Sequence, residues 1–142
     1  MSEIVIGITF GSFDLLHAGH VSMLEQCKKQ CNWLIVGLQT DPTIDRHTKN
    51  KPIQTVFERY LLLKNSKHVD EIIPYDTEKD LLNLIATVPI NVRFLGEDYL
   101  GVSVTGNDLC SQLNIDIIYL KRKHNFSTSE LRNRIEEARS IF

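Results

Sequence analysis

Short apolar runs alternate with amphipathic segments along this chain, and the alternation predicts the order of its secondary structure. Runs rich in β-branched and aromatic residues predict five strands, over residues 4–10, 33–38, 71–75, 91–95 and 115–120. Apolar residues at helical spacing predict helices between them, over residues 18–31, 55–66, 78–87 and 106–113, and a last helix that begins near Ser127. Strands that alternate with helices are typical of a parallel sheet with helices on both faces. We therefore expect an α/β fold, formed by one domain over residues 1–142.

The last predicted helix has a well-marked beginning and a regular pattern. Ser127 and Glu130 stand at the spacing of a capping box, in which each side chain satisfies a backbone N–H of the other residue. Further along, apolar residues recur at helical intervals and form one stripe: Leu131, Ile135, Ala138 and Phe142. The pattern predicts a helix that starts at Ser127 and has one apolar face.

Residues 11–20, which we call the histidine turn, connect the first predicted strand to the first predicted helix. Gly11 allows the backbone to approach a ligand closely or to adopt an unusual φ. His17 and His20 are three residues apart at the start of the helix, so they share one side of it. The first N–H groups of a helix lack partners, and the helix dipole makes that end positive. The histidine turn therefore favours phosphate binding, with metal ligation or an ordinary surface position of the two histidines as alternatives.

Polar residues directly follow four of the five predicted strands. They are residues 11–20 after the first strand, 40–41 after the second, 96–99 after the fourth and 121–124 after the fifth. Ligands of open parallel sheets bind beyond the carboxyl ends of the strands, where the strand order reverses. We therefore expect these four groups to meet at one edge of the sheet and to form a single site.

Residues 43–52, which we call the basic flap, form a polar segment between the second predicted strand and the helix after it. The segment carries Arg46, Lys49 and Lys51. Two interpretations are equally compatible with its composition: a solvated surface loop, or a mobile segment whose cations meet an anionic ligand.

Composition narrows the function classes. The 142 residues are 42% hydrophobic and 24% charged with a net charge of −2, which gives no indication of nucleic-acid binding. The three cysteines form no Cys-x-x-Cys pair, which is typical of a reducing, cytoplasmic location. No apolar run reaches the length of a membrane span, and we expect neither a signal peptide nor a membrane partner.

The residue types at the expected site favour transfer of a phosphorus-containing group. The site combines histidines, cations and two helix N-termini, but it has few carboxylates placed as general bases. The chain has no Ser-His-Asp arrangement, no P-loop lysine and no Gly-x-Gly-x-x-Gly motif for hydride chemistry. Attack of a phosphate monoester on the α-phosphate of a nucleoside triphosphate suits such a site, because the nucleophile is already anionic and needs only positioning and charge stabilisation. Magnesium would then be carried mainly by the triphosphate.

The histidine turn, Gly-Ser-Phe-Asp-Leu-Leu-His-Ala-Gly-His, resembles the HxGH signature of the nucleotidyltransferase superfamily. Within it, the chain is similar to the cytidylyltransferase family, above all to its glycerol-3-phosphate cytidylyltransferase members, over nearly the whole chain to about Glu136. The resemblance implies a Rossmann-like fold and an enzyme that releases pyrophosphate. It also implies a homodimer.

The resemblance further implies a role for each site residue. Catalytic roles are implied for His17, His20, Arg122 and Lys49. The implied nucleotide-binding residues are Phe10, Gly11, Ser12, Phe13, Asp14, His17, Gly19, His20, Gly96, Asp98, Tyr99, Arg122, Ser127 and Thr128. The implied acceptor-binding residues are Asp41, Lys49, Lys51 and Arg59, the last reaching the acceptor's phosphate. Asp14 is expected to orient the histidine turn, and no side chain is expected to ligate a metal.

Two departures from the family pattern leave the substrates open. The second signature usually reads Arg-Thr-x-Gly-Ile-Ser-Thr, but here residues 122–128 read Arg-Lys-His-Asn-Phe-Ser-Thr, and Tyr99 stands where the family has tryptophan. We expect CTP and a small phosphorylated alcohol such as glycerol 3-phosphate. Ala18 and Gly19 also match adenylyltransferases that act on heptose 1-phosphate, so ATP with a sugar 1-phosphate is an alternative. A flavin mononucleotide adenylyltransferase and a non-catalytic nucleotide-binding module on the same fold are further alternatives.

Overall fold

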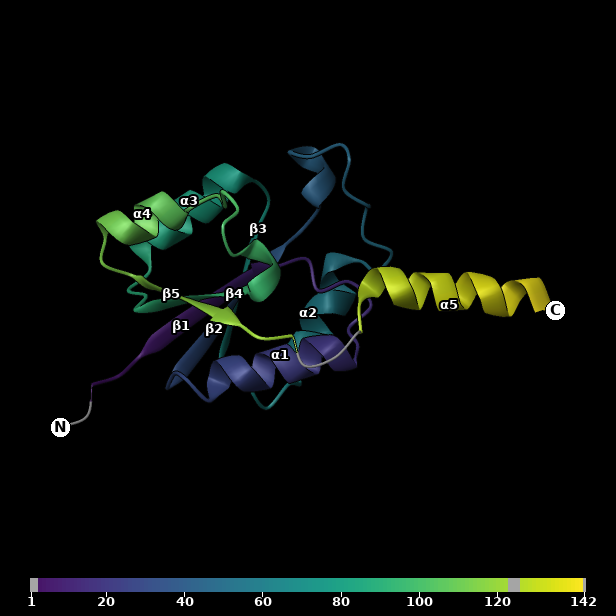
Figure 1. Cartoon of the computed structure of the whole chain (residues 1–142), viewed down its shortest axis with the longest axis horizontal. Coiled ribbons are helices and arrows are strands. Elements are labelled where there is room, and N and C mark those ends of the chain that lie inside the picture. The colour runs from purple at the N-terminus through teal and green to yellow at the C-terminus, as the bar shows by residue number, and fades with distance from the viewer. Residues whose placement is uncertain (1–2, 123–125, 142) are drawn as a thin grey trace.

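A computed structural model describes residues 3–122 and 126–141, and in it five parallel strands form one sheet. The strands are β1 (Ile6–Gly11), β2 (Trp33–Gln39), β3 (Glu71–Tyr75), β4 (Val92–Gly96) and β5 (Asp116–Leu120). The helices are α1 (Ala18–Lys28), α2 (Val56–Lys64), α3 (Glu78–Thr87), α4 (Asn107–Gln112) and α5 (Thr128–Ile141). The expected α/β architecture with a five-stranded parallel sheet is confirmed (Figure 1).

Alternation of side chains along the strands produces two apolar layers, one on each face of the sheet. On one face, Leu34 and Val36 of β2 pack in a cluster with Leu24 of α1 and Leu63 of α2. On the other, Ile8 and Ile35 pack in a second cluster with Leu81 and Ile85 of α3 and Cys110 of α4. Both faces are thus covered, which explains why the strand sequences read as short continuous apolar runs.

The strand order is β3-β2-β1-β4-β5, so the order of the chain reverses between β1 and β4. β1 pairs with β2 on one side and with β4 on the other. The histidine turn leaves the carboxyl end of β1, and the short 3₁₀ helix Glu97–Tyr99 leaves the carboxyl end of β4. These two segments therefore begin at the reversal point, where ligands of such sheets bind.

Helix starts are set by capping side chains. Thr55 and Glu58 form a reciprocal capping box at α2, and Thr77 and Asp80 form another at α3. At α5, the Ser127 hydroxyl accepts a hydrogen bond from the Glu130 backbone N–H at 3.0 Å, as the sequence predicts. Among the described residues, no helix combines the length and the apolar character needed to cross a bilayer.

Helix α5 differs from the other helices in where its apolar side chains lie. It extends away from the sheet (Figure 1). Leu131 in its first turns is half-buried, whereas Ile135 is 48% exposed and Ala138 is exposed. Phe142, the last residue of the predicted stripe, lies outside the described residues. The predicted apolar face of α5 is therefore covered only near its N-terminus.

Candidate active site

In the histidine turn, two residues other than glycine have an unusual backbone conformation. Phe13 and Leu15 have φ values of 51° and 52°, in the left-handed region that side chains rarely adopt. Gly11 does not, so of its two expected roles the unusual φ is not observed, and the close approach of its backbone to a ligand stays a prediction. Its glycine identity has another cause, because a Cβ at this position would lie 3.1 Å from the Phe13 ring. Strained residues of this kind persist only where neighbouring contacts fix them, and they cluster at functional sites.

Asp14 supplies the contacts that fix the turn. Its side chain is 4% exposed, and its carboxylate accepts hydrogen bonds from the backbone N–H groups of Ile53 and Gln54 at 2.9 and 3.0 Å. The same carboxylate pairs with Arg132 of α5 at 2.8 Å. The Gln54 side chain returns a contact, since its Oε1 accepts from the Leu15 N–H at 2.7 Å. Three segments far apart in sequence thus meet at one buried carboxylate.

Arg59 lies beneath the turn rather than in an open acceptor site. Its side chain is 2% exposed, and the guanidinium donates hydrogen bonds to the carbonyl oxygens of Ser12, Gln39, Thr40 and Gln54. An arginine committed to four carbonyls has little capacity left for a phosphate. Arg59 thus ties the segment after β1 to the segment after β2, and its expected contact with the acceptor's phosphate stays a prediction.

His17 and His20 lie together at the start of α1, with ring centroids 3.9 Å apart. His17 is the N-cap residue: its Nδ1 accepts from the Gly19 N–H at 3.0 Å, and His20 Nδ1 accepts from the His17 N–H at 3.2 Å. An accepting Nδ1 carries no proton, so in each neutral ring the proton is assigned to Nε2. Both imidazoles therefore carry an Nε2–H, a group that can donate to a phosphate oxygen, and the Nε2 of His17 faces Thr128 Oγ1.

Burial keeps His20 neutral. The surrounding protein and the nearby His17 lower the pKa of His20 to about 4, although the Asp14 carboxylate acts in the opposite direction. The ring also packs against Phe13, with centroids 5.4 Å apart. At neutral pH, His20 is thus a fixed, uncharged hydrogen-bond donor rather than a cation.

The first residue of α5, Thr128, contacts the histidine pair. Thr128 Oγ1 lies 3.2 Å from His17 Nε2 and donates to the Asp14 carbonyl oxygen at 3.3 Å. The tautomer assigned above gives this chain one direction, from His17 Nε2–H to the threonine hydroxyl and on to the carbonyl. The N-termini of α1 and α5 therefore converge, and both contribute positive dipole ends to the same space. A small hollow of about 110 Å³ between them is lined by His17, Ala18, Phe126, Ser127, Glu130, Leu131 and Arg134.

Arg122 connects this region to the end of β4. Its Nη2 donates to the Phe126 carbonyl oxygen at 2.7 Å, and its backbone N–H donates to Glu97 Oε1 at 3.1 Å. Asp98 Oδ2 lies 3.8 Å from its Nη1. Tyr99, the residue after Asp98, is 45% exposed. Arg122 thus links the segment after β4, residues 97–98, to Phe126, which precedes α5. Residues 123–125 of the second signature lie outside the described residues.

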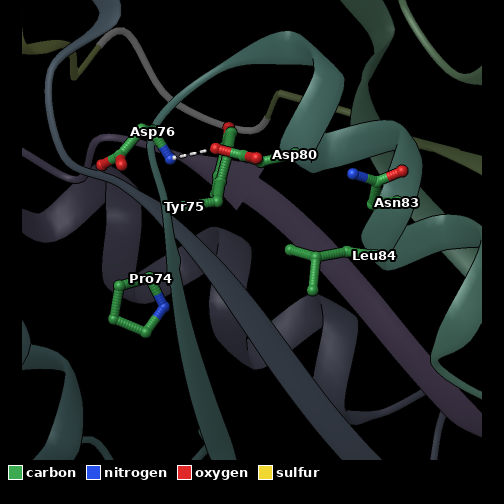
Figure 2. A pocket seen from close by; sticks show the side chains of 6 residues that line it. All are labelled: Pro74, Tyr75, Asp76, Asp80, Asn83 and Leu84. Atoms are coloured by element: carbon green, nitrogen blue, oxygen red, sulfur yellow. Dashed lines mark hydrogen bonds between the residues drawn. The ribbon is translucent and has the colours of Figure 1, made fainter.

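Phe10 lies on the far side of the sheet from α1 and α2. Its ring meets Tyr75 edge-on at 5.6 Å, with the Arg93 guanidinium carbon 5.2 Å from its centroid. Tyr75 also lines a hollow of about 390 Å³, together with Pro74, Asp76, Asp80, Asn83 and Leu84 (Figure 2). This hollow lies at β3, the strand at the sheet edge, with β2 between it and β1. It therefore does not belong to the histidine site.

The basic flap is attached at its start and its end, and its lysines are exposed. Asp41 accepts from the Thr43 N–H and hydroxyl and so caps the 3₁₀ helix Pro42–Ile44, which also lowers the pKa of the aspartate. Arg46 pairs with Glu78 at the start of α3 at 2.8 Å. Lys49 and Lys51 form no ion pair within the described residues. The expected substrate contacts of Asp41, Lys49 and Lys51 stay predictions.

Sequence reasoning missed Arg132 and Gln54, both of which contact the histidine turn. Neither residue belongs to a signature motif, and no local pattern marks a cation that reaches back to a distant turn.

Within the described residues, no group of three His, Cys, Asp or Glu side chains could hold a metal ion.

Comparisons with known proteins agree with this geometry. The model of the cytidylyltransferase-like family matches residues 8–134. Glycerol-3-phosphate cytidylyltransferase of Bacillus subtilis strain 168 is 31% identical over 128 residues, covering 90% of this chain and 95% of that protein. The bifunctional protein HldE of Caulobacter sp. strain K31 is 37% identical over 131 residues, covering 92% of this chain but only 27% of that protein. The chain therefore spans about a quarter of the HldE relatives.

Solved structures extend the comparison. The lipopolysaccharide core biosynthesis protein from Thermoplasma volcanium superimposes with a TM-score of 0.68 at 26% identity, covering 87% of this chain and 100% of that one. A pantoate-β-alanine ligase from Francisella tularensis shares the fold alone, with a TM-score of 0.62 at 18% identity, covering 96% of this chain and 72% of that one. Taken with the paired histidines at the reversal point of the sheet, the family match shows that this chain belongs to the cytidylyltransferase-like nucleotidyltransferases.

Proposed function

We propose that this protein transfers a nucleotidyl group from a nucleoside triphosphate to a small phosphorylated alcohol and releases pyrophosphate. CTP and glycerol 3-phosphate are the favoured pair. The observation that carries the proposal is the stacked His17–His20 pair, whose Nε2–H groups lie where the N-termini of α1 and α5 converge, that of His17 in contact with Thr128 Oγ1. Donors of this kind stabilise charge that develops on phosphate oxygens.

The chemistry follows from the donor set. A phosphate oxygen of the acceptor attacks the α-phosphorus, the P–O bond to the β-phosphate breaks, and its electron pair leaves with pyrophosphate. The nucleophile is already an anion, so the site needs no strong general base. His17 and His20 would hold the triphosphate oxygens and stabilise their growing charge, and Arg122 would stabilise the departing pyrophosphate. Magnesium, carried by the triphosphate, would neutralise part of the phosphate charge.

Adenylyl transfer to a sugar 1-phosphate is the second candidate. It is supported by the 37% identity to the HldE protein of Caulobacter sp. strain K31 and by Ala18 and Gly19 in the histidine turn. Both candidates use the same paired histidines and differ in the base and the acceptor.

We also propose, from the family resemblance, that the protein is a homodimer. Sedimentation that shows a monomer at all working concentrations would contradict this proposal.

The test is a panel of CTP and ATP against glycerol 3-phosphate, heptose 1-phosphate and other sugar phosphates, with magnesium and with pyrophosphate release as the readout. We expect release with CTP and glycerol 3-phosphate in the wild type and its loss in His20→Asn. Release only with ATP and a sugar 1-phosphate would support the second candidate. Nucleotide binding without pyrophosphate from any pair would show a binding module instead.

A further inference from the structure

Arg132 lies in the second turn of α5 and reaches the turn that follows β1. Its Nη2 contacts Asp14 Oδ2 at 2.8 Å, and the two side chains are 27% and 5% exposed. Thr128, four residues earlier on the same helix, contacts Asp14 and His17. Residues four apart share a helix face, so Arg132 and Thr128 form one contact surface between α5 and the histidine turn.

The Asp14 carboxylate is shared among segments that each carry part of the site. Its Oδ2 accepts from both Arg132 and the Ile53 N–H, and its Oδ1 accepts from the Gln54 N–H. Ile53 and Gln54 directly follow the basic flap. Arg59 is close enough to interact with this carboxylate but donates its hydrogen bonds to carbonyl oxygens. Removal of Arg132 would thus take the contacting cation from a buried carboxylate, which is costly.

We propose that Arg132 is a positioning residue for nucleotidyl transfer. Through Asp14 it holds three parts in one arrangement: the start of α5, the turn that presents His17, and the backbone at the end of the basic flap. It touches none of the reacting atoms. Because misplacement of catalytic groups by about 1 Å can lower a rate roughly 100-fold, a contact at this distance from the chemistry can matter for turnover. The proposal rests on the proposed function.

The primary test compares Arg132→Met, Arg132→Lys and a control on the same helix. Arg132→Met should lower kcat by about 100-fold while KM for the nucleotide changes much less. Arg132→Lys should recover much of this loss, because the observed contact uses one guanidinium nitrogen and an ammonium can replace it. The control is Arg139→Met, whose side chain is 77% exposed, and it should match the wild type.

Two measurements separate positioning from general stability. Amide exchange at Ile53 and Gln54 should speed up in Arg132→Met, because their acceptor loses its fixed orientation, whereas exchange in β2 should not change. Asp14→Asn should lower kcat as well, and the double variant should be no worse than the more severe single variant, since both remove the same contact. Should Arg132→Met fail to fold, Arg132→Gln, which keeps a neutral N–H donor, carries the same test.

A wild-type kcat in folded Arg132→Met, or a lowered melting temperature with kcat and exchange unchanged, would overturn the proposal. So would additive effects of the Asp14 and Arg132 changes. Failure of the proposed function looks different: the wild type itself would release no pyrophosphate. The exchange of Ile53 and Gln54 can be measured without catalysis, so it tests the role of Arg132 in either case.

Discussion

The histidine turn and the basic flap both carry potential phosphate-binding groups, but they are built in opposite ways. In the turn, Asp14 is buried and fully occupied, and His17 and His20 each use a ring nitrogen to accept a backbone N–H. In the flap, Lys49 and Lys51 are exposed and unpaired within the described residues. The turn is already ordered in the folded chain, so binding of an anion there would cost little further conformational entropy. The exposed flap lysines would lose conformational entropy on binding an anion.

The difference suggests a division of labour. Fixed donors need no reorganisation when charge develops, so they contribute most to the chemical step. Exposed lysines are strongly hydrated and flexible, so we expect the flap lysines to act in capture of the nucleotide and in charge neutralisation. The predictions below test this division, beginning with the largest expected effect.

Loss of a fixed hydrogen-bond donor should lower kcat more than the other changes proposed below. His20→Asn or His17→Asn should lower kcat about 100- to 1,000-fold, or roughly 2.7–4 kcal/mol, because each removes an Nε2–H donor. Asparagine keeps an oxygen that can accept the backbone N–H now bonded to Nδ1, so the fold should survive, as thermal unfolding would show. His47→Asn, at an exposed histidine of the flap, is the control. Similar rates in all three variants would remove the distinction between the regions.

Acid should destabilise the turn through His20. The folded pKa is about 4 and the ordinary value is 6.5, so between these values the unfolded state binds more protons. The contribution of neutral His20 is therefore fully present above pH 6.5 and is lost as the pH falls toward 4. The difference between the two pKa values corresponds to roughly 3 kcal/mol. Urea unfolding above pH 6.5 and near pH 4 should show a smaller change for His20→Asn; equal changes would contradict the assignment.

Arg122 tests whether fixed geometry matters beyond charge. Arg122→Lys keeps the charge but loses the planar fork of donors, which now contacts Phe126. We expect the single-turnover rate to fall about tenfold, or ~1.4 kcal/mol, with a smaller change in nucleotide affinity. Arg139→Lys on α5 is the matched control. An unchanged chemical step would take Arg122 out of the mechanism.

The smallest effect should be a change in flap dynamics. Addition of nucleotide and magnesium should slow amide exchange over residues 43–52, whereas exchange in the histidine turn should change little. The reason is that the triphosphate would supply an anionic partner for Lys49 and Lys51, which form no ion pair within the described residues. Equal protection of both segments would mean that the turn, too, is ordered only by the ligand.

Much of the fold could be predicted because its causes are local. The ranges predicted for β3 and α3 match the structure, residues 71–75 and 78–87, since β3 reads as a short apolar run and Thr77 caps the next helix. The convergence of polar segments follows from parallel topology alone. The two 3₁₀ helices were not predicted, because three-residue helices have no hydrophobic periodicity.

The rest of the site could not be predicted because its causes lie far apart in the chain. Arg59 reads as an ordinary helix cation, and only the folded chain shows the carbonyl groups that surround it. Arg132 likewise has no local sign of its contact with Asp14. The left-handed Phe13 and Leu15 are hidden for a related reason: neither is a residue type that favours that conformation, so tertiary contacts must impose it.

The Asp14–Arg132 contact joins residues separated by 118 positions, and this has a consequence for synthesis of the chain on the ribosome. All five strands precede α5, so the residues of the sheet are synthesised before those of α5. Until α5 has been made, Asp14 has no Arg132 and His17 has no Thr128. A nascent chain that ends before residue 128 therefore contains all five strands but lacks every contact between α5 and the histidine turn.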